Sequence, residues 1–263
     1  MTKIAITGVG GRMGKRIAAI AIESEKFDIV AAIEARGHEA LACDVGEQAG
    51  VGTFGLAVSK ELIGSPEVVI DFSEPEGTMA WLALCRDRKL PMVIGTTGLT
   101  ESQLAEVADS AAAIPLVHSA NMSVGINLLL KLVAQVARAL GDDYDIDICE
   151  THHRFKKDAP SGTAIALAKS ICDAVGRRYG DTVVLGRGGQ CPRAKGEIGI
   201  HAMRIGDTVG EHTVLFGNLG ETISLGHSAH TRDTLARGAL RAAQWVVGKA
   251  PGLYDMLDVL GLK

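Results

Sequence analysis

The sequence predicts an α/β protein: a Rossmann-like, doubly wound parallel sheet domain plus a second α+β domain with an open mixed sheet. Over the first half of the chain, short apolar runs of strand length alternate with segments of helical periodicity, a pattern typical of parallel sheets. The first apolar run ends at a glycine-rich turn that opens a helix, as in dinucleotide-binding units. The region 182–228 is instead rich in Gly, Thr and β-branched residues, which favours a separate sheet.

The chain has 263 residues, enough for two modest domains that each have a core. We expect a dinucleotide-binding domain over residues 1–123, completed by the C-terminal segment 231–263. A substrate-binding and oligomerisation domain is expected over residues 124–230.

The first predicted βαβ unit starts with an apolar strand over residues 3–7, which runs into the glycine turn at Gly8. The helix that follows has apolar residues at helical spacing, namely Met13, Ile17, Ile20 and Ala21. A second apolar strand over residues 27–33 is closed by Glu34. This acid lies about 20 residues past the last glycine, the separation expected for a carboxylate that binds the adenosine ribose.

The glycine spacing departs from the usual G-x-G-x-x-G, because Met13 occupies the final glycine position of that pattern. Gly8, Gly11 and Gly14 give G-x-x-G-x-x-G instead. A glycine turn alone can simply reverse the chain. The βαβ context together with Glu34 favours dinucleotide binding.

The alternation then continues with strands over 67–73, 90–94 and 114–118 and helices over 77–86 and 102–113. In doubly wound sheets, ligands bind beyond the carboxyl ends of the strands. Segments of small and polar residues follow three strands at these positions: Phe72-Ser73, Gly95-Thr96-Thr97 and Ser119-Ala120-Asn121-Met122. Each could be a generic turn, but together they indicate one binding edge.

The second domain is expected to begin with a helix over residues 126–140 and an alternating strand over 144–150 that carries acidic residues on one face. A helix over 163–175 and strands over 198–204, 212–216 and 222–227 follow. Such an open sheet leaves edges and a face to be covered, which favours subunit association. The chain should end with a helix over 231–247 and a segment, 252–256, that packs back onto the first domain.

The segment from Glu150 to Thr163 is the most informative for chemistry. It contains the adjacent pair His152-His153, the cations Arg154, Lys156 and Lys157, and the helix-initiating Ser161-Gly162-Thr163. Histidine titrates near neutral pH and suits proton transfer. A helix start carries unpaired N–H groups and roughly +0.5 of a charge, which suits a carboxylate or phosphate. The alternative is a solvated, charged loop capped by Ser161.

Composition excludes several classes of function. A net charge of −4 argues against general nucleic-acid binding. No uninterrupted run of 18 apolar residues is present, so no membrane span is expected. The five cysteines are far apart and form no C-x-x-C pair, so we expect neither a disulfide framework nor a metal site. A reducing cytoplasm fits this cysteine usage best.

The motifs together resemble the family of 4-hydroxy-tetrahydrodipicolinate reductases, also called dihydrodipicolinate reductases. The resemblance spans essentially the whole chain, and the histidine segment carries it most specifically. It implies an NADH- or NADPH-dependent oxidoreductase of lysine and diaminopimelate biosynthesis. The implied reaction reduces a cyclic, imine-like dicarboxylate with loss of water, giving tetrahydrodipicolinate. The resemblance also implies a cytoplasmic homotetramer.

The resemblance implies roles for individual residues. His152 would be the proton donor and acceptor and Lys156 a second proton donor, while His153, Gly162 and Thr163 would bind substrate. Arg154 would serve site electrostatics or a structural ion pair. The cofactor would contact the glycine turn, the ribose-binding acid and the later strand ends: Gly8, Val9, Gly10, Gly11, Arg12, Met13, Glu34, Arg36, Gly95, Thr96, Thr97, Ser119, Ala120, Asn121 and Met122.

One position departs from the family pattern and bears on cofactor preference. Family members often have an arginine directly after the ribose-binding acid, where it can meet the 2′-phosphate of NADPH. Here that position is Ala35, and Arg36 follows one step later. Because Glu34 repels a 2′-phosphate and accepts hydroxyls, we expect NADH to be used at least as well as NADPH. The protein could use both cofactors if the Arg36 side chain reaches the 2′-phosphate of NADPH.

Two alternatives are kept. Another two-domain NAD(P)-dependent dehydrogenase, such as an aspartate dehydrogenase, would explain the glycine turn but not the crowded histidine segment. A non-catalytic dinucleotide-binding protein would bind the cofactor tightly without turnover, and it would be expected to have replaced His152 or Lys156. Both residues are present.

Overall fold

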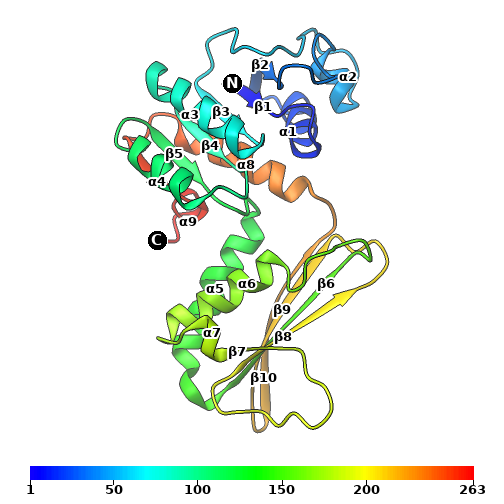
Figure 1. Ribbon diagram of the computed structural model, residues 1–263, viewed down its shortest axis with the longest axis vertical. Helices are drawn as coiled ribbons and strands as arrows, with labels where there is room; N and C mark the ends of the chain where they lie inside the picture. Colours follow the sequence, from blue (N-terminus) through cyan, green and yellow to red (C-terminus); the bar gives the residue numbers. More distant parts are fainter. The chain divides into compact units, whose positions relative to one another are not determined.

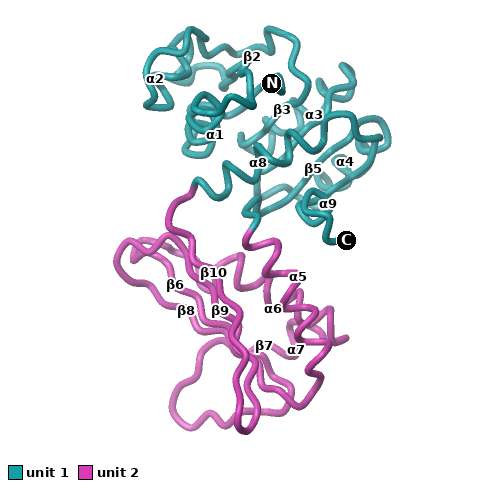
Figure 2. The backbone as a smooth tube through the Cα atoms, turned by 180° about the vertical axis from the view of Figure 1, so that it is seen from behind, with its two compact units in different colours: residues 1–124, 233–263 teal, residues 125–232 magenta.

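The computed structural model describes residues 1–263. The chain forms two compact units. Unit 1 comprises residues 1–124 and 233–263, and unit 2 comprises residues 125–232 (Figure 2).

Unit 1 is built on a six-stranded sheet in the order β11-β5-β4-β3-β1-β2, in which every strand pair is parallel (Figure 1). Its strands are β1 (Thr2–Thr7), β2 (Phe27–Ile33), β3 (Val68–Asp71), β4 (Met92–Ile94), β5 (Pro115–His118) and β11 (Gly252–Tyr254). Its helices are α1 (Arg12–Ile22), α2 (Val45–Ala49), α3 (Pro75–Arg88), α4 (Glu101–Ser110), α8 (Asp233–Val246) and α9 (Met256–Leu260).

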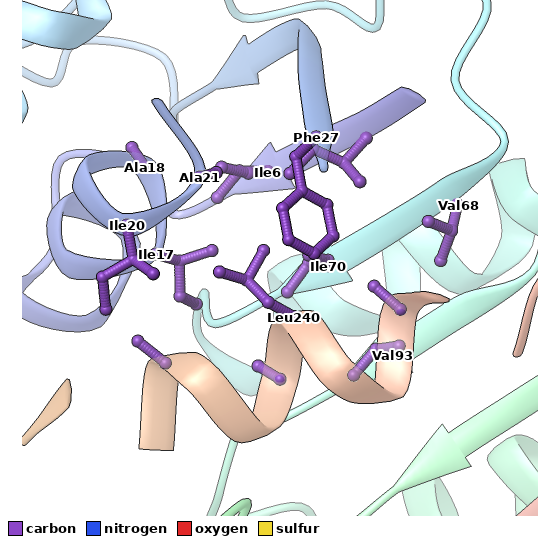
Figure 3. Close-up of a cluster of buried hydrophobic side chains, with 14 of the residues drawn as sticks. Ile6, Ile17, Ala18, Ile20, Ala21, Phe27, Val68, Ile70, Val93 and Leu240 are labelled. Carbon is purple, nitrogen blue, oxygen red and sulfur yellow. The ribbon is translucent and has the colours of Figure 1, made fainter. Parts of the chain in front are cut away.

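Alternate residues of the strands of unit 1 face two separate cores. Ile4 and Ile6 of β1 point into a cluster with α1 and α8, whereas Ala5 points into a cluster with α3 and α4. Figure 3 shows the first cluster, with Ile17 of α1 and Leu240 of α8 against the strand residues. Each isoleucine or leucine side chain in this cluster contributes about 1.5–3 kcal/mol to the stability of the fold when fully buried. Helices on both faces of a parallel sheet confirm the predicted doubly wound domain.

The C-terminal segment contributes a strand to this sheet. Strand β11 pairs in parallel with β5 at the sheet edge. Tyr254 of β11 packs edge-to-face on Trp245 of α8, with ring centroids 5.1 Å apart. Residues distant in sequence therefore share one core with the N-terminal unit.

Unit 2 contains a five-stranded mixed sheet in the order β10-β9-β6-β8-β7. The pairs β6–β8 and β7–β8 are parallel, and β6–β9 and β9–β10 are antiparallel. Its strands are β6 (Asp145–His152), β7 (Val183–Leu185), β8 (Ile198–Arg204), β9 (Gly210–Asn218) and β10 (Glu221–Ala229). Its helices are α5 (Val124–Leu140), which begins at the last residue of unit 1, α6 (Gly162–Ala174), α7 (Tyr179–Thr182) and the 3₁₀ turn η1 (Gly141–Asp143). The predicted open mixed sheet is thus confirmed.

The helices of unit 2 pack on one face of its sheet. Leu129 of α5 and Leu167 of α6 share a buried cluster with Ile148 and Phe216 from the strands. The opposite face carries small and polar side chains in register across three strands, with Cys149 beside His201 and Thr213. In β10, the residues on that side are exposed, and Ile223 and Leu225 point toward the helices.

Several short elements, among them α2, α7, β7 and α9, were not predicted from the sequence, since each has five residues or fewer and shows no measurable periodicity. One prediction about β6 was wrong. Asp145 and Asp147 lie on the outer face, but Glu150 has the parity of Ile146 and Ile148 and is fully buried. A buried carboxylate on a core face needs partners.

One helical stretch, Val124–Asp143, is long and apolar enough to cross a membrane by length and composition alone. A single stretch of this kind is weak support for a span, because core helices of globular units pass the same test. Here Leu129, Val133 and Ala137 pack into the core of unit 2.

Candidate active site

The carboxyl ends of the strands of unit 1 border a cavity of about 850 Å³. Five of the predicted cofactor residues line it: Gly8, Gly11, Arg12, Glu34 and Arg36. Sequence reasoning missed several of its other lining residues, among them His38, Lys60 and Trp81. They were missed because they lie outside the glycine motif and reach the cavity only through the tertiary fold. Trp81 of α3 is also packed, partly buried, against the cluster that contains Ala5.

Glu34 holds the glycine turn in place. Its Oε2 accepts the Gly10 N–H at 2.7 Å, and its Oε1 accepts the Ala35 N–H at 2.8 Å. A Cβ on Gly10 would lie 2.5 Å from Cε1 of His38 and 3.0 Å from Glu34 Oε2. A side chain at position 10 would displace the ends of His38 and Glu34, whereas Gly8 is required by its φ of +70° and by the Phe72 carbonyl, 2.5 Å from where its Cβ would lie.

A second cavity of about 360 Å³ lies at the same strand ends. Its lining includes the predicted residues Arg12, Met13, Gly95, Thr96, Thr97, Ala120 and Met122. The other predicted cofactor residues shape the loops instead. Val9 is buried in the core, Ser119 Oγ donates to the carbonyl of Asn121 at 2.8 Å, and Asn121 Oδ1 accepts the Ser123 N–H at 2.9 Å.

Asp71, fully buried at the end of β3, ties these strand ends together. Its carboxylate accepts hydroxyl hydrogen bonds from the end of β1, from the start of α3 and from the loop after β4. The donors are Thr7, Ser73 at 2.6 Å, Thr78 and Thr96 at 2.8 Å. One carboxylate therefore joins the ends of β1 and β3, the start of α3 and the loop after β4.

In unit 2, the histidine segment runs from the last residue of β6 to the first turn of α6. His152 ends the strand, and Ser161 is the N-cap of the helix, where its Oγ accepts the Ala164 N–H at 3.2 Å. Gly162 opens onto free space, since a Cβ there would meet no atom within 4 Å. Backbone N–H groups of a first helical turn point outward and favour an anion.

The His152 imidazole is held by the buried Glu150. Nδ1 of His152 pairs with Glu150 Oε2. The Arg204 guanidinium donates two hydrogen bonds to the same carboxylate, of 3.0 and 2.9 Å. The Ser161 N–H donates to Glu150 Oε1 at 3.0 Å. On the other side, the His212 ring meets His152 edge-to-face with centroids 5.2 Å apart, and its Nε2 lies 3.1 Å from Ser161 Oγ.

Burial and charge set the protonation of this network. Burial is the largest influence on His152 and lowers the pKa of its imidazole; Glu150 raises that pKa, but the net pKa stays below the ordinary histidine value. Burial raises the pKa of the Glu150 carboxyl, yet the bonds from Arg204, His152 and Ser161 together hold that pKa below its usual value. Burial lowers the pKa of His212 to about 4.

The lowered pKa favours the neutral form of the His152 imidazole at pH 7. Its Nδ1–H donates to the carboxylate, so Nε2 is the nitrogen that can exchange a proton.

The other predicted residues lie in the same segment. Nζ of Lys156 pairs with Asp158 at 2.9 and 2.8 Å. The His153 ring packs near Phe155 with centroids 6.3 Å apart, and its buried Nδ1 has no hydrogen-bond partner. Thr163 stands in the first turn of α6. Arg154 is exposed, and its N–H donates to the Gly206 carbonyl at 3.1 Å.

Metal-ligating atoms also meet here. Glu150, His152 and His212 each offer one such atom, all within 4.8 Å of one another. However, Arg204 and Ser161 already occupy the Glu150 oxygens. The arrangement is therefore that of a closed hydrogen-bonded network. The expectation that the protein needs no metal stays a prediction.

Sequence signals for the missed residues differ. Glu150 could have been recognised by its parity with Ile146 and Ile148. Arg204 and His212 could not, because only the pairing of β6 with both β8 and β9 brings them to His152.

Known proteins of one family match this chain over nearly its whole length. The family model described as dihydrodipicolinate reductase, N-terminus, matches residues 2–122, and that for the C-terminus matches residues 125–260. A 4-hydroxy-tetrahydrodipicolinate reductase of Alkalilimnicola ehrlichii is 49% identical over 265 residues and covers 99% of both chains. One of Geobacter sulfurreducens is 48% identical over 267 residues and covers 100% of both.

Among solved structures, the dipicolinate-bound dihydrodipicolinate reductase from Paenisporosarcina sp. TG-14 has the same fold, with a TM-score of 0.77, 23% identity and 98% coverage of both chains. The resemblance inferred from the sequence motifs is confirmed. The chain belongs to the 4-hydroxy-tetrahydrodipicolinate reductase family, also called the dihydrodipicolinate reductase family.

Proposed function

We propose that the protein reduces 4-hydroxy-tetrahydrodipicolinate to tetrahydrodipicolinate with NADH or NADPH, in lysine and diaminopimelate biosynthesis. Family membership over the full chain supports this function. The observation that carries it in the structure is the joining of His152, through Glu150, to the start of α6. A proton-exchanging imidazole and an anion-binding helix start are thus held together by one carboxylate.

The reaction consumes a hydride and a proton and releases water, so it needs both a proton donor and charge neutralisation. We assign proton exchange to His152 Nε2 and a second donor role to Lys156. His153, Gly162 and Thr163 hold substrate carboxylates, to which charge-assisted hydrogen bonds contribute about 1.5–3 kcal/mol each. Two carboxylates beside His152 raise the pKa of its imidazole, so substrate binding favours proton uptake.

Unit 1 binds the cofactor in this proposal, and unit 2 binds substrate and mediates subunit contacts. The strand-end cavities and their residues fit a dinucleotide: Glu34 suits a ribose hydroxyl, and Arg12 suits a phosphate. The bound nicotinamide supplies the hydride. The residues of this chain orient it and shape the walls around it.

NADH is expected to serve at least as well as NADPH, since Glu34 lies beside the glycine turn and disfavours a 2′-phosphate. Replacing Arg36 by alanine should raise the KM for NADPH about threefold or more and leave the KM for NADH unchanged. The effect is modest because Arg36 is exposed and screened. Steady-state kinetics with both cofactors measure it, with Arg86→Ala, an exposed arginine outside both cavities, as the control. A much lower KM for NADPH in the wild type, at equal turnover, would contradict the expected preference.

We also propose a homotetramer that works in the cytoplasm. The uncovered face of the unit 2 sheet, with Cys149, His201 and Thr213, supports subunit association. The five free cysteines suit a reducing compartment. Light scattering on the eluting protein should give four times the chain mass of 27.5 kDa, and Thr213→Lys should lower that mass. A wild-type mass of one chain would overturn the tetramer.

Complementation tests the proposed function in a cell. A bacterial strain that lacks its own reductase and depends on added diaminopimelate should grow without it when it expresses this chain. Expression of His152→Gln at the same level should not restore growth. Failure of the wild type, despite folded protein in the cell, would overturn the proposed function.

A further inference from the structure

We propose that Glu150 is a positioning residue for the reaction, which fixes the His152 ring and the start of α6 in one geometry. The inference rests on the proposed role of His152. It adds a residue that lies behind the site and touches neither substrate nor cofactor in this account.

The contacts of Glu150 reach three elements. The side chain is fully buried, and its two oxygens accept from His152 on its own strand, from Arg204 on β8 and from the Ser161 N–H at the cap of α6. Ser161 then caps the helix with its Oγ, directly before Gly162. One carboxylate therefore sets the distance between the proton-exchanging ring and the helix start.

The Nε2 side of the ring faces a glycine. Gly210 is the first residue of β9, and a Cβ there would lie 3.1 Å from His152 Nε2. Glu150 thus restrains the ring at Nδ1, and glycine at position 210 leaves Nε2 uncrowded. A carboxylate that pairs with Nδ1 selects one tautomer and one ring orientation.

The charges around His152 show why the carboxylate is needed. Arg204 from β8 and Lys156 from the loop after β6 both disfavour an imidazolium at this place, and Glu150 favours it. His212 from β9 faces the ring as a buried imidazole and adds no negative charge. Without the Glu150 charge, His152 would hold its proton only at lower pH.

The test compares Glu150→Gln with the wild type in full steady-state kinetics across pH. Glutamine keeps the size of the side chain and removes its charge. We expect kcat to fall about tenfold or more, because a placed proton donor contributes about 10²- to 10⁴-fold. The alkaline limb of the kcat profile should move to lower pH, while the Kd for NADH stays unchanged. An unchanged kcat and an unchanged limb in folded Glu150→Gln would overturn the inference.

A second variant keeps the inference testable if Glu150→Gln does not fold. Gly210→Ala leaves every charge in place and crowds His152 Nε2, so kcat should fall at least about threefold, with the alkaline limb unmoved. Gly180→Ala is the matched control, because a Cβ there meets no atom within 4 Å. Wild-type kcat in both alanine variants would show that the placement of the His152 ring does not limit the reaction, and it would overturn the inference. Inactivity of the wild type itself would instead count against the proposed function, which keeps the two failures apart.

Discussion

Replacing His152 by glutamine is expected to lower kcat about 10²-fold or more and to leave the Kd for NADH unchanged. Glutamine can still donate to Glu150, so the network of Arg204 and Ser161 should stay in place. It cannot release a proton near neutral pH, and positioned acid–base groups contribute about 10²- to 10⁴-fold. The loss therefore falls on the chemical step. Steady-state kinetics and fluorescence titration of NADH separate the two quantities.

His201→Gln is the matched control for this substitution. His201 lies on the neighbouring strand β8 and contacts Asp147 at 3.3 Å on the outer face of the sheet. Its kcat should stay within about twofold of the wild type. If His152→Gln itself stayed within about threefold of the wild type, the effect on the barrier would be under about 1 kcal/mol. The acid–base role of His152 would then be wrong.

Replacing Lys156 by alanine should have the second large effect, again about 10²-fold on kcat. The Lys156 side chain is partly buried, and its ammonium group is paired with the Asp158 carboxylate. That ammonium lowers the pKa of the Asp158 carboxyl, which is thus ionised at neutral pH. An arriving substrate carboxylate must compete with Asp158 for the same cation, so the KM for substrate should also rise.

Lys157→Ala is the control, since the neighbouring lysine is exposed. It should leave kcat and KM unchanged within about twofold. Equal behaviour of Lys156→Ala and Lys157→Ala would show that the segment acts only through its net charge. Loss in Lys156→Ala alone supports a role for that one ammonium group.

The fold could be predicted from the sequence because local patterns determine most of unit 1. The apolar strand over 27–33 and the glycine turn at Gly8 both signal a βαβ unit within about 30 residues. The strand order of unit 2 could not be predicted in this way. Placing β6 between β8 and β9 depends on pairings between residues some 50 positions apart, such as Cys149 with His201.

The candidate site likewise contains residues that local sequence patterns predict and residues that only strand pairing brings together. His152, Lys156 and Gly162 lie close together in sequence, so their residue types alone indicated chemistry. Glu150 was assigned to the wrong face of its strand, and Arg204 and His212 reach His152 only through the sheet. His38 and Lys60 reach the cofactor cavity from loops without periodicity. Residues that support a site from other strands are therefore the part that needs a structure.

The central claim, that this chain is the reductase, is tested most directly by an assay in which a synthase makes the cyclic substrate from pyruvate and aspartate semialdehyde. Oxidation of NADH and NADPH is followed in parallel by loss of nicotinamide absorbance. We predict oxidation that requires both the substrate and this protein, with NADH at least as effective as NADPH. No oxidation, despite demonstrable binding of the cofactor, would contradict it.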